Sequence, residues 1–180
     1  MKKLLKLKEL KKLFLLLPIL LLISCAVKVK TVNDSFYGTQ HYETDYMTII
    51  GWLYELKFRF IASKNSNVIL VEVQYIAYDS FTISKNDEIV LKFSDDSFIN
   101  LSYINDMPAV DRSFYTSSYG SVYSSSSYTI NAAARINNDI GTLTAIRIEN
   151  SGGFKNLDIS QSFAKKFQKA YNDIKNKINE

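Results

Sequence analysis

Apolar and polar residues alternate over long stretches of the chain, and this alternation predicts β-strands. In residues 52–62 every second position is apolar and charged side chains occupy most positions between, so one face of the strand is buried and the other is wet. A polar turn at residues 64–67 separates this segment from residues 68–78, which repeat the pattern. The two segments predict an antiparallel hairpin.

Two more hairpins follow from the same alternation. Residues 89–93 and 98–104 flank a short polar turn that contains two aspartates. Residues 142–149 and 154–159 flank a Gly-Gly pair at residues 152–153, and glycine permits the positive φ that a tight reversal needs. Three hairpins of this kind indicate an antiparallel sheet protein.

The period changes near the C-terminus, where apolar residues recur every three or four positions over residues 162–179. This spacing predicts one amphipathic α-helix with lysines on its other face. Ser160 or Ser162 supplies the hydroxyl that caps its first turn. We expect the helix to cover a face of the sheet, and its basic side leaves a membrane-surface or partner-binding role open.

These elements predict a mainly β fold, an antiparallel β-sandwich or sheet of about seven strands with one C-terminal amphipathic α-helix. A single sheet covered by one helix would leave the second face of residues 68–78 exposed, so two sheets are favoured over one. Residues 39–180 are long enough for one domain with a core of its own, and packing alone must stabilise it because they contain no cysteine.

The N-terminal residues have a different pattern, in which lysines precede an apolar run. The run, residues 13–23, is about half the length of the ~20-residue helix that spans a membrane, which is typical of a secretory signal peptide. Residues 22–25, Leu-Ile-Ser-Cys, resemble the lipobox of bacterial lipoproteins, and Cys25 is the only cysteine. The resemblance implies that residues 1–24 are cleaved and that Cys25 carries diacylglycerol and acyl chains such as palmitate.

Removing residues 1–24 changes the charge of the chain. Those residues carry six lysines and one glutamate, a net charge of +5. The whole chain has a formal charge of +4, so the remainder has −1. A nucleic-acid partner is therefore not expected, because such proteins concentrate Lys and Arg on one face. Residues 25–38 are interpreted as the lipidated cysteine and a tether, although the alternation in residues 27–32 also permits a first strand. Because Ala26 stands where an aspartate would signal inner-membrane retention, the predicted location is the cell envelope, with the outer membrane favoured.

Two structural stretches extend the resemblance beyond the N-terminus. Residues 88–101 form a strand-turn-strand with an acidic turn, and residues 142–171 lead through a glycine turn into the final helix. In this order they resemble small lipoproteins and secreted proteins of Bacteroides-type bacteria, a group to which no activity is assigned. The resemblance supports the fold and implies no chemistry.

The chain offers few groups for catalysis. His41 is the only histidine and lies in a polar stretch, where we expect a surface side chain, and Cys25 is used by lipid. A Cys-His nucleophile is thereby excluded, and a Ser-His-Asp arrangement would have to use His41. Zinc sites usually draw their ligands from Cys, His and carboxylates, so no such site and no cofactor is predicted.

Pairs of aspartates that could supply oxygen ligands for calcium occur in two places. Asp95 with Asp96, and Asp106 with Asp111, lack the spacing of an EF-hand loop, and the first pair is expected to form a turn. No metal site is predicted. Paired carboxylates for glycoside hydrolysis stay open, because their separation is a property of the fold.

The most distinctive composition lies in residues 113–128, where tyrosines are embedded in serines and one glycine. Tyrosine supplies a large amphipathic contact area and serine supplies adaptable hydrogen bonds, which is the chemistry of binding loops. One interpretation is an edge strand or surface loop whose rings pack on the sheet; the other is a surface that docks a sugar ring. The candidate ligand-binding residues are Tyr115, Tyr119, Tyr123 and Tyr128.

Two functional hypotheses follow. The first is a non-enzymatic lipoprotein that is anchored to the membrane by Cys25 and binds a glycan or an envelope protein through the tyrosine-rich segment. The second is a lipid-anchored enzyme that acts on envelope polymer or glycan. Exposed tyrosines on one surface would favour the first hypothesis, and two or more carboxylates converging in a pocket would favour the second.

Overall fold

The computed structural model describes residues 27–35, 39–64, 66 and 68–180. Within them the chain is mainly β, with an antiparallel open sheet and one C-terminal helix, which confirms the predicted fold class. The sheet is larger than predicted, with eleven strands in the described residues instead of about seven. The strands are β1 (Val29–Asp34), β2 (Thr39–Thr44), β3 (Met47–Ile50), β4 (Tyr54–Ser63), β5 (Ile69–Ala77), β6 (Glu88–Phe93), β7 (Phe98–Tyr103), β8 (Ala109–Thr116), β9 (Val122–Ile136), β10 (Leu143–Asn150) and β11 (Gly153–Asp158), and the helix is α2 (Gln161–Ile178).

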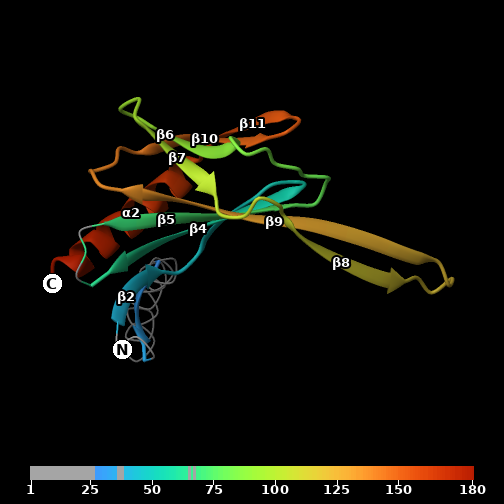
Figure 1. The fold of residues 1–180 in the computed structure, drawn as a ribbon, viewed down its shortest axis with the longest axis horizontal. Coiled ribbons are helices and arrows are strands. Elements are labelled where there is room, and N and C mark those ends of the chain that lie inside the picture. Colours follow the sequence, from blue (N-terminus) through green and yellow to red (C-terminus); the bar gives the residue numbers. More distant parts are fainter. Residues whose placement is uncertain (1–26, 36–38, 65, 67) are drawn as a thin grey trace, which may run out of the picture.

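The strands form one continuous hydrogen-bonded sheet, so the preference for two sheets is wrong. Its order is β1-β2-β4-β5-β9-β7-β6-β10-β11, with β3 added to β4 and β8 added to β9. Only two residue pairs, Ser102 with Ala133 and Tyr103 with Ala132, join β7 to β9. Beyond this narrow junction, β6, β7, β10 and β11 lie as a separate layer over the rest of the sheet (Figure 1).

The second face of β5 needs no covering sheet, because its polar side chains bond to neighbouring strands. Glu72 accepts a hydrogen bond from Arg59 Nε at 2.7 Å, and the same guanidinium donates to Glu43 at 3.0 Å. Gln74 donates to Asn131 on β9 at 3.3 Å. Side chains satisfied in this way can remain half exposed, which is why the expectation of a second sheet failed.

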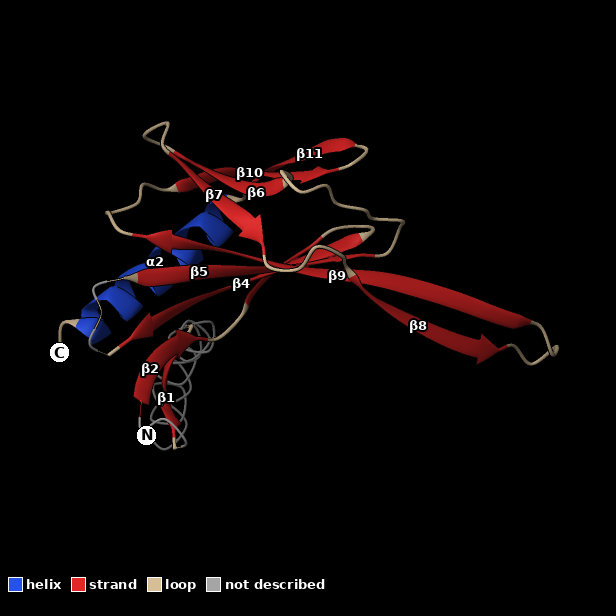
Figure 2. Cartoon of the chain, viewed as in Figure 1, coloured by secondary structure: helices blue, strands red, loops and turns tan. Residues whose placement is uncertain are grey.

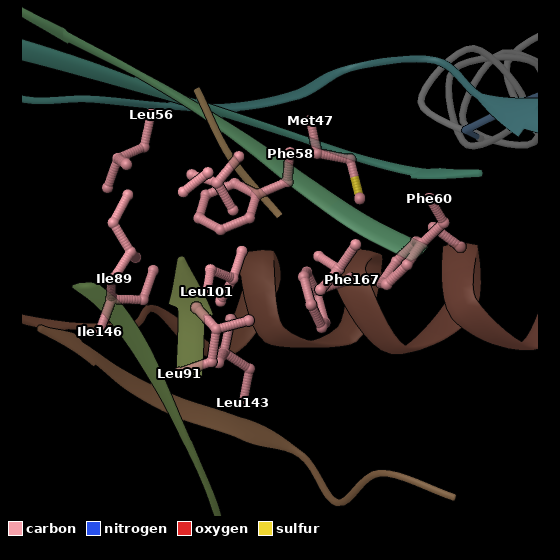
Figure 3. Close-up of a cluster of buried hydrophobic side chains, with 14 of the residues drawn as sticks. Met47, Leu56, Phe58, Phe60, Ile89, Leu91, Leu101, Leu143, Ile146 and Phe167 are labelled. Carbon is pink, nitrogen blue, oxygen red and sulfur yellow. The ribbon is translucent and has the colours of Figure 1, made fainter. Parts of the chain in front are cut away.

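The core lies where the two layers of the bent sheet and helix α2 meet. Figure 3 shows buried side chains from β3, β4, β6, β7 and β10 converging on the helix. Phe167 of α2 packs edge-on against Phe60 and Phe58, with ring centroids 4.9 and 5.9 Å apart. The largest fully buried side chains are Phe58, Phe60, Phe93, Phe167, Met47, Leu56, Ile89, Leu91, Leu101, Ile130, Leu143 and Ile146.

Helix α2 covers the sheet as predicted, and its start identifies the cap. Ser160 is the N-cap residue, and its Oγ accepts a hydrogen bond from the Phe163 N–H at 3.3 Å. Of the two candidate caps, Ser160 is therefore the one used. The buried stripe confirms the amphipathic pattern and consists of Phe163, Ala164, Phe167, Ala170, Tyr171 and Ile174.

The three predicted hairpins are present as β4–β5, β6–β7 and β10–β11, but two local expectations change. Trp52, predicted to face the core, is 92% exposed, because β4 begins only at Tyr54 and the Gly51 N–H donates to the Tyr54 carbonyl across a turn. Residues 29–34 form β1 and pair with β2. The strand alternative for residues 27–32 therefore holds there in place of a tether.

Candidate functional site

A long hairpin made by β8 and β9 extends beyond the rest of the sheet (Figure 2). From Tyr128 to Ile136, β9 pairs with β5 and is a central strand. From Val122 to Ser127, β9 pairs with β8 alone. Residues 109–127, here called the arm, thus form a two-stranded ribbon outside the core, in the segment that sequence reasoning interpreted as a loop or edge strand.

The tip of the arm is organised by one serine and one glycine. The Ser117 N–H donates to the Ser121 carbonyl at 2.8 Å, and the Ser117 hydroxyl accepts from the N–H groups of Tyr119 and Ser121 at 3.3 and 3.2 Å. Gly120 has φ +78°, which side-chain-bearing residues rarely adopt. These bonds present Tyr119 at the outermost turn, where it is 95% exposed.

The arm has two chemically different faces, because neighbouring strand residues point to opposite sides. The apolar face carries Phe114 and Val122, 70% and 68% exposed, with Val110 nearer the base, and Arg112, Ser124 and Ser126 lie on the same side. Phe114 and Val122 are diagonal cross-strand neighbours. The other face, the serine face, contains Ser113 and Ser125, whose hydroxyls are 2.6 Å apart.

The structure does not bring the four predicted tyrosines into one platform. Tyr123 is half exposed on the serine face and lies opposite Tyr115 in the backbone register. Tyr119 is at the tip, whereas Tyr128 is on the opposite face from Tyr123 and packs against the core at the base of the arm. Of the tyrosines in this segment whose side chains the structure describes, Tyr119 and Tyr123 are the two with exposed rings.

The apolar face was missed at the sequence level. Val110 and Phe114 are separated on their face by Arg112, and Val122 belongs to the next strand, so no apolar two-residue period marks this face in the sequence. One signal was available, because residues 113–134 contain no charged side chain. Exposed segments that lack charge and carry large apolar groups are typical of interaction surfaces.

Both long edges of the arm are open along the residues that the structure describes, since β8 pairs only with β9 and residues 122–127 pair only with β8. Sheet edges are usually protected by charges, proline or shortness, as unpaired N–H and C=O groups invite another strand. The other edges follow this rule: β1 carries Lys30, β11 carries Lys155, and β3 has four residues. The distal part of the arm, residues 113–127, has no charged residue and no proline to protect its edges.

An acidic depression of about 390 Å³ lies elsewhere, at the start of β6 and the end of β7, and is lined by Asp87, Glu88 and Asp106. The Asp87 carboxylate accepts the Ser84 N–H at 2.6 Å. Tyr103, also in its lining, donates its hydroxyl to the Glu149 carbonyl at 2.7 Å, and burial raises the pKa of that phenol. Two of its groups thus already have structural roles.

The remaining candidates have structural positions. His41 lies half-buried on β2, between Val32 of β1 and Ser63 of β4. Asp95 Oδ1 accepts hydrogen bonds from the hydroxyl and N–H of Ser97 at 2.7 and 3.2 Å, which lowers the pKa of Asp95, so this residue is a turn former as predicted. Asp96 follows in the same turn with φ +60°.

Metal ligation finds no support in the described part of the chain. No group of three or more His, Cys, Asp or Glu side chains there could hold an ion; Asp111 is on β8, and Asp106 lines the acidic depression. Cys25 lies outside the described residues, so its predicted lipidation has no structural description. Among the helices of the described residues, none is long and apolar enough to span a bilayer.

No protein-family model matches the chain, and no curated protein or solved structure matches it.

Proposed function

We propose that this chain is a non-enzymatic envelope lipoprotein, anchored through Cys25, that binds a partner with its arm. The observation that carries the proposal is the projection of a two-stranded ribbon, with Phe114, Tyr119 and Val122 exposed on it. A two-stranded ribbon outside a core is marginally stable in water, so a long one with large exposed apolar side chains is costly to maintain without a use.

The chemistry of the arm favours a polypeptide partner. Its open edges offer unpaired backbone donors and acceptors to an extended segment, which would add to the ribbon as another strand. The neutral stretch from Ser113 to Ala134 fits a partner strand of apolar and hydroxyl side chains, because charged side chains would lose hydration without gaining a counter-ion. A glycan stacking on Tyr119 and Tyr123 is the alternative outcome of the test.

Support for the anchor comes from the lysine-rich start, the short apolar run and the lipobox-like residues 22–25. One acyl chain binds a membrane only marginally, whereas the two or three chains of a bacterial lipoprotein anchor it firmly. Cells fed labelled palmitate should incorporate the label into the wild-type protein and not into Cys25→Ala. If the variant labels like the wild type, the anchor is rejected.

Photo-cross-linking in cells tests the arm. A benzophenone amino acid placed at Tyr119 should give one discrete cross-linked protein, while the same group at Asn172, on the exposed side of α2, should give none. Adding Phe114→Ser and Val122→Ser should abolish the Tyr119 cross-link, because both substitutions remove apolar contact area and leave the tip turn intact. Equal cross-linking from Tyr119 and Asn172 would refute the arm as the contact element.

A glycan panel separates the two ligand classes. If the full-length protein binds a polysaccharide and the double variant Tyr119→Ala with Tyr123→Ala does not, the partner is a carbohydrate held by stacking. If binding persists in the double variant, the tyrosines are eliminated as its site.

The acidic depression favours one second candidate, an enzyme acting on envelope polymer or glycan. Glu88 and Asp106 line it, and unlike Asp87 their carboxylates form no hydrogen bond with the residues that the structure describes. Hydrolysis of any envelope polysaccharide that is abolished by Glu88→Gln or Asp106→Asn would establish this candidate and overturn the non-enzymatic proposal.

A further inference from the structure

The described chain starts beside the first turns of α2, in a groove with an apolar floor. Val27 is buried there, and with Ile49 of β3 and Phe163 of α2 it lines a groove of about 550 Å³. Three lysines of α2 line the same groove, namely Lys165, Lys166 and Lys169. The fold thus brings the N-terminal segment, the apolar floor and a cluster of positive charge to one place.

The two lysines closest to the helix start are not explained by helix stability. Lys165 and Lys166 are exposed and form no salt bridge with any residue that the structure describes, while Lys169 pairs with Asp173 at 2.5 Å. The N-terminal end of a helix carries partial positive charge and favours acidic neighbours, yet the first turn of α2 has no acidic residue. By contrast, Lys175 and Lys177 at the helix end each pair with a carboxylate.

We propose that this groove and its lysine rim rest on the anionic headgroups of the bilayer that holds Cys25. This inference depends on the proposed lipid anchor. Cys25 precedes Val27 by two residues, which limits the distance between their Cα atoms to about 7 Å. The lipid attached to Cys25 is therefore confined near the mouth of the groove, where bilayer headgroups are also within reach.

The chemistry of the groove fits a phospholipid surface. Lysines close to an anionic bilayer gain electrostatic attraction, and apolar side chains between them can enter the boundary between headgroups and acyl chains. Val27, Ile49 and Phe163 supply the apolar part, and the unpaired Lys165 and Lys166 supply the charge. Contact at this face would give the anchored domain one preferred orientation, and would fix the direction of the arm relative to the membrane.

Depth-dependent quenching tests the orientation on the full, lipidated protein reconstituted into vesicles. A nitrobenzoxadiazole label on Ser162→Cys reports from the groove, and the same label on Ser121→Cys reports from the arm tip, because the Cys25 thiol is occupied by lipid. The vesicles contain brominated phosphatidylcholine, with or without phosphatidylglycerol. We expect strong quenching of the Ser162 label in the anionic vesicles, weaker quenching in the neutral ones, and almost none at Ser121.

Charge-reversal variants identify the residues responsible. Lys165→Glu with Lys166→Glu should remove the extra quenching seen in anionic vesicles, whereas Lys64→Glu with Lys155→Glu, on exposed lysines outside the groove, should retain it. Salt near 1 M, where the Debye length is about 3 Å, should act like the first variant. Replacing helix lysines near the N-terminal end by glutamate also agrees with the helix dipole, so loss of folding is not expected.

Failure of this inference is distinguishable from failure of the anchor. If the protein stays on the vesicles and the Ser162 label is quenched no more than the Ser121 label, the groove does not face the bilayer and the inference is overturned. If Cys25 takes up no palmitate and the protein leaves the vesicles, the anchor is wrong and the inference falls with it.

Discussion

Replacing Phe167 by alanine should remove one of the main contacts between α2 and the sheet. Phe167 is fully buried, and its ring packs edge-on against Phe60 and Phe58. Truncating a buried phenylalanine costs about 3 to 5 kcal/mol through lost transfer free energy and the cavity left behind. The two ring contacts, each worth roughly 0.5 to 1.5 kcal/mol beyond burial, argue against a loss at the lower end, so the expected loss is about 4 kcal/mol.

Urea unfolding followed by far-ultraviolet circular dichroism measures this loss. Tryptophan fluorescence is a poor probe here because Trp52 is exposed. In a thermal melt, about 4 kcal/mol corresponds to a decrease of roughly 8 to 16 °C for a chain of this size. As a control, Phe154→Ala on β11 removes an exposed ring that stacks on Arg147 at 4.5 Å, and should cost less than about 1 kcal/mol.

A loss below about 1 kcal/mol for Phe167→Ala would refute the packing argument, provided that the slope of the unfolding free energy against urea concentration is unchanged. A cavity of this size cannot form in a close-packed core at so little cost. The conservative change Phe167→Leu fills most of the cavity and should recover more than half of the lost stability. Equal losses for the alanine and leucine variants would also contradict the reasoning, because they would show that ring volume does not matter at this position.

Three further changes test separate parts of the structure. Burial, and then the charge of Asp79, raise the pKa of Tyr75 to about 12. The free energy of unfolding should therefore have its full value below pH 10 and decrease between pH 10 and pH 12, where the unfolded chain loses this proton and the folded chain keeps it. The decrease should be shallower in Tyr75→Phe, and an identical slope in the variant would contradict this. Arg59→Met leaves two half-buried carboxylates without their shared partner and should cost about 1 kcal/mol, less at high salt, as measured by urea unfolding. Ser160→Ala removes the helix cap and should cost about 1 kcal/mol, whereas Ser162→Ala should change stability by only a few tenths; equal effects would reject the cap assignment.

The local elements of this fold could be predicted from sequence because their signals are local. The β4–β5 hairpin follows from alternation on both sides of a polar turn, and α2 follows from its three- and four-residue period. The order of the sheet could not be derived, because β5 pairs with β9 and β6 pairs with β10 across long separations in sequence. Such pairings depend on which surfaces meet in the folded chain, and single-strand patterns do not encode them.

Two errors show where alternation misleads. Trp52 continues the inward period of β4 in the sequence. In the structure it lies in the turn between Gly51 and Tyr54, ahead of the first residue of β4, and its ring is in solvent. The preference for two sheets assumed that the second face of β5 required apolar cover. The bonds from Arg59 to its two carboxylates satisfy that face without a second sheet.

Composition singles out the segment around Tyr119 as a candidate site, whereas the arrangement of its rings depends on the register of the strands. A count of tyrosines carries no information about which side of a ribbon each ring occupies. Register does, and it separates Tyr123 from Tyr128 while placing Phe114 near Val122. The sequence indicated the basic side of α2, but it could not show the groove at Val27, since the residues that form the groove come from the N-terminus, β3 and α2.

The length of β9 has a mechanical consequence. This one 15-residue strand runs from the tip of the arm to the middle of the sheet, where nine of its residues pair with β5 (Figure 1). A force applied at the tip acts along the strand axis and loads those nine pairs in shear, so they must yield together and cannot peel apart one after another. A pull on the arm is therefore resisted by the centre of the sheet and not by its rim.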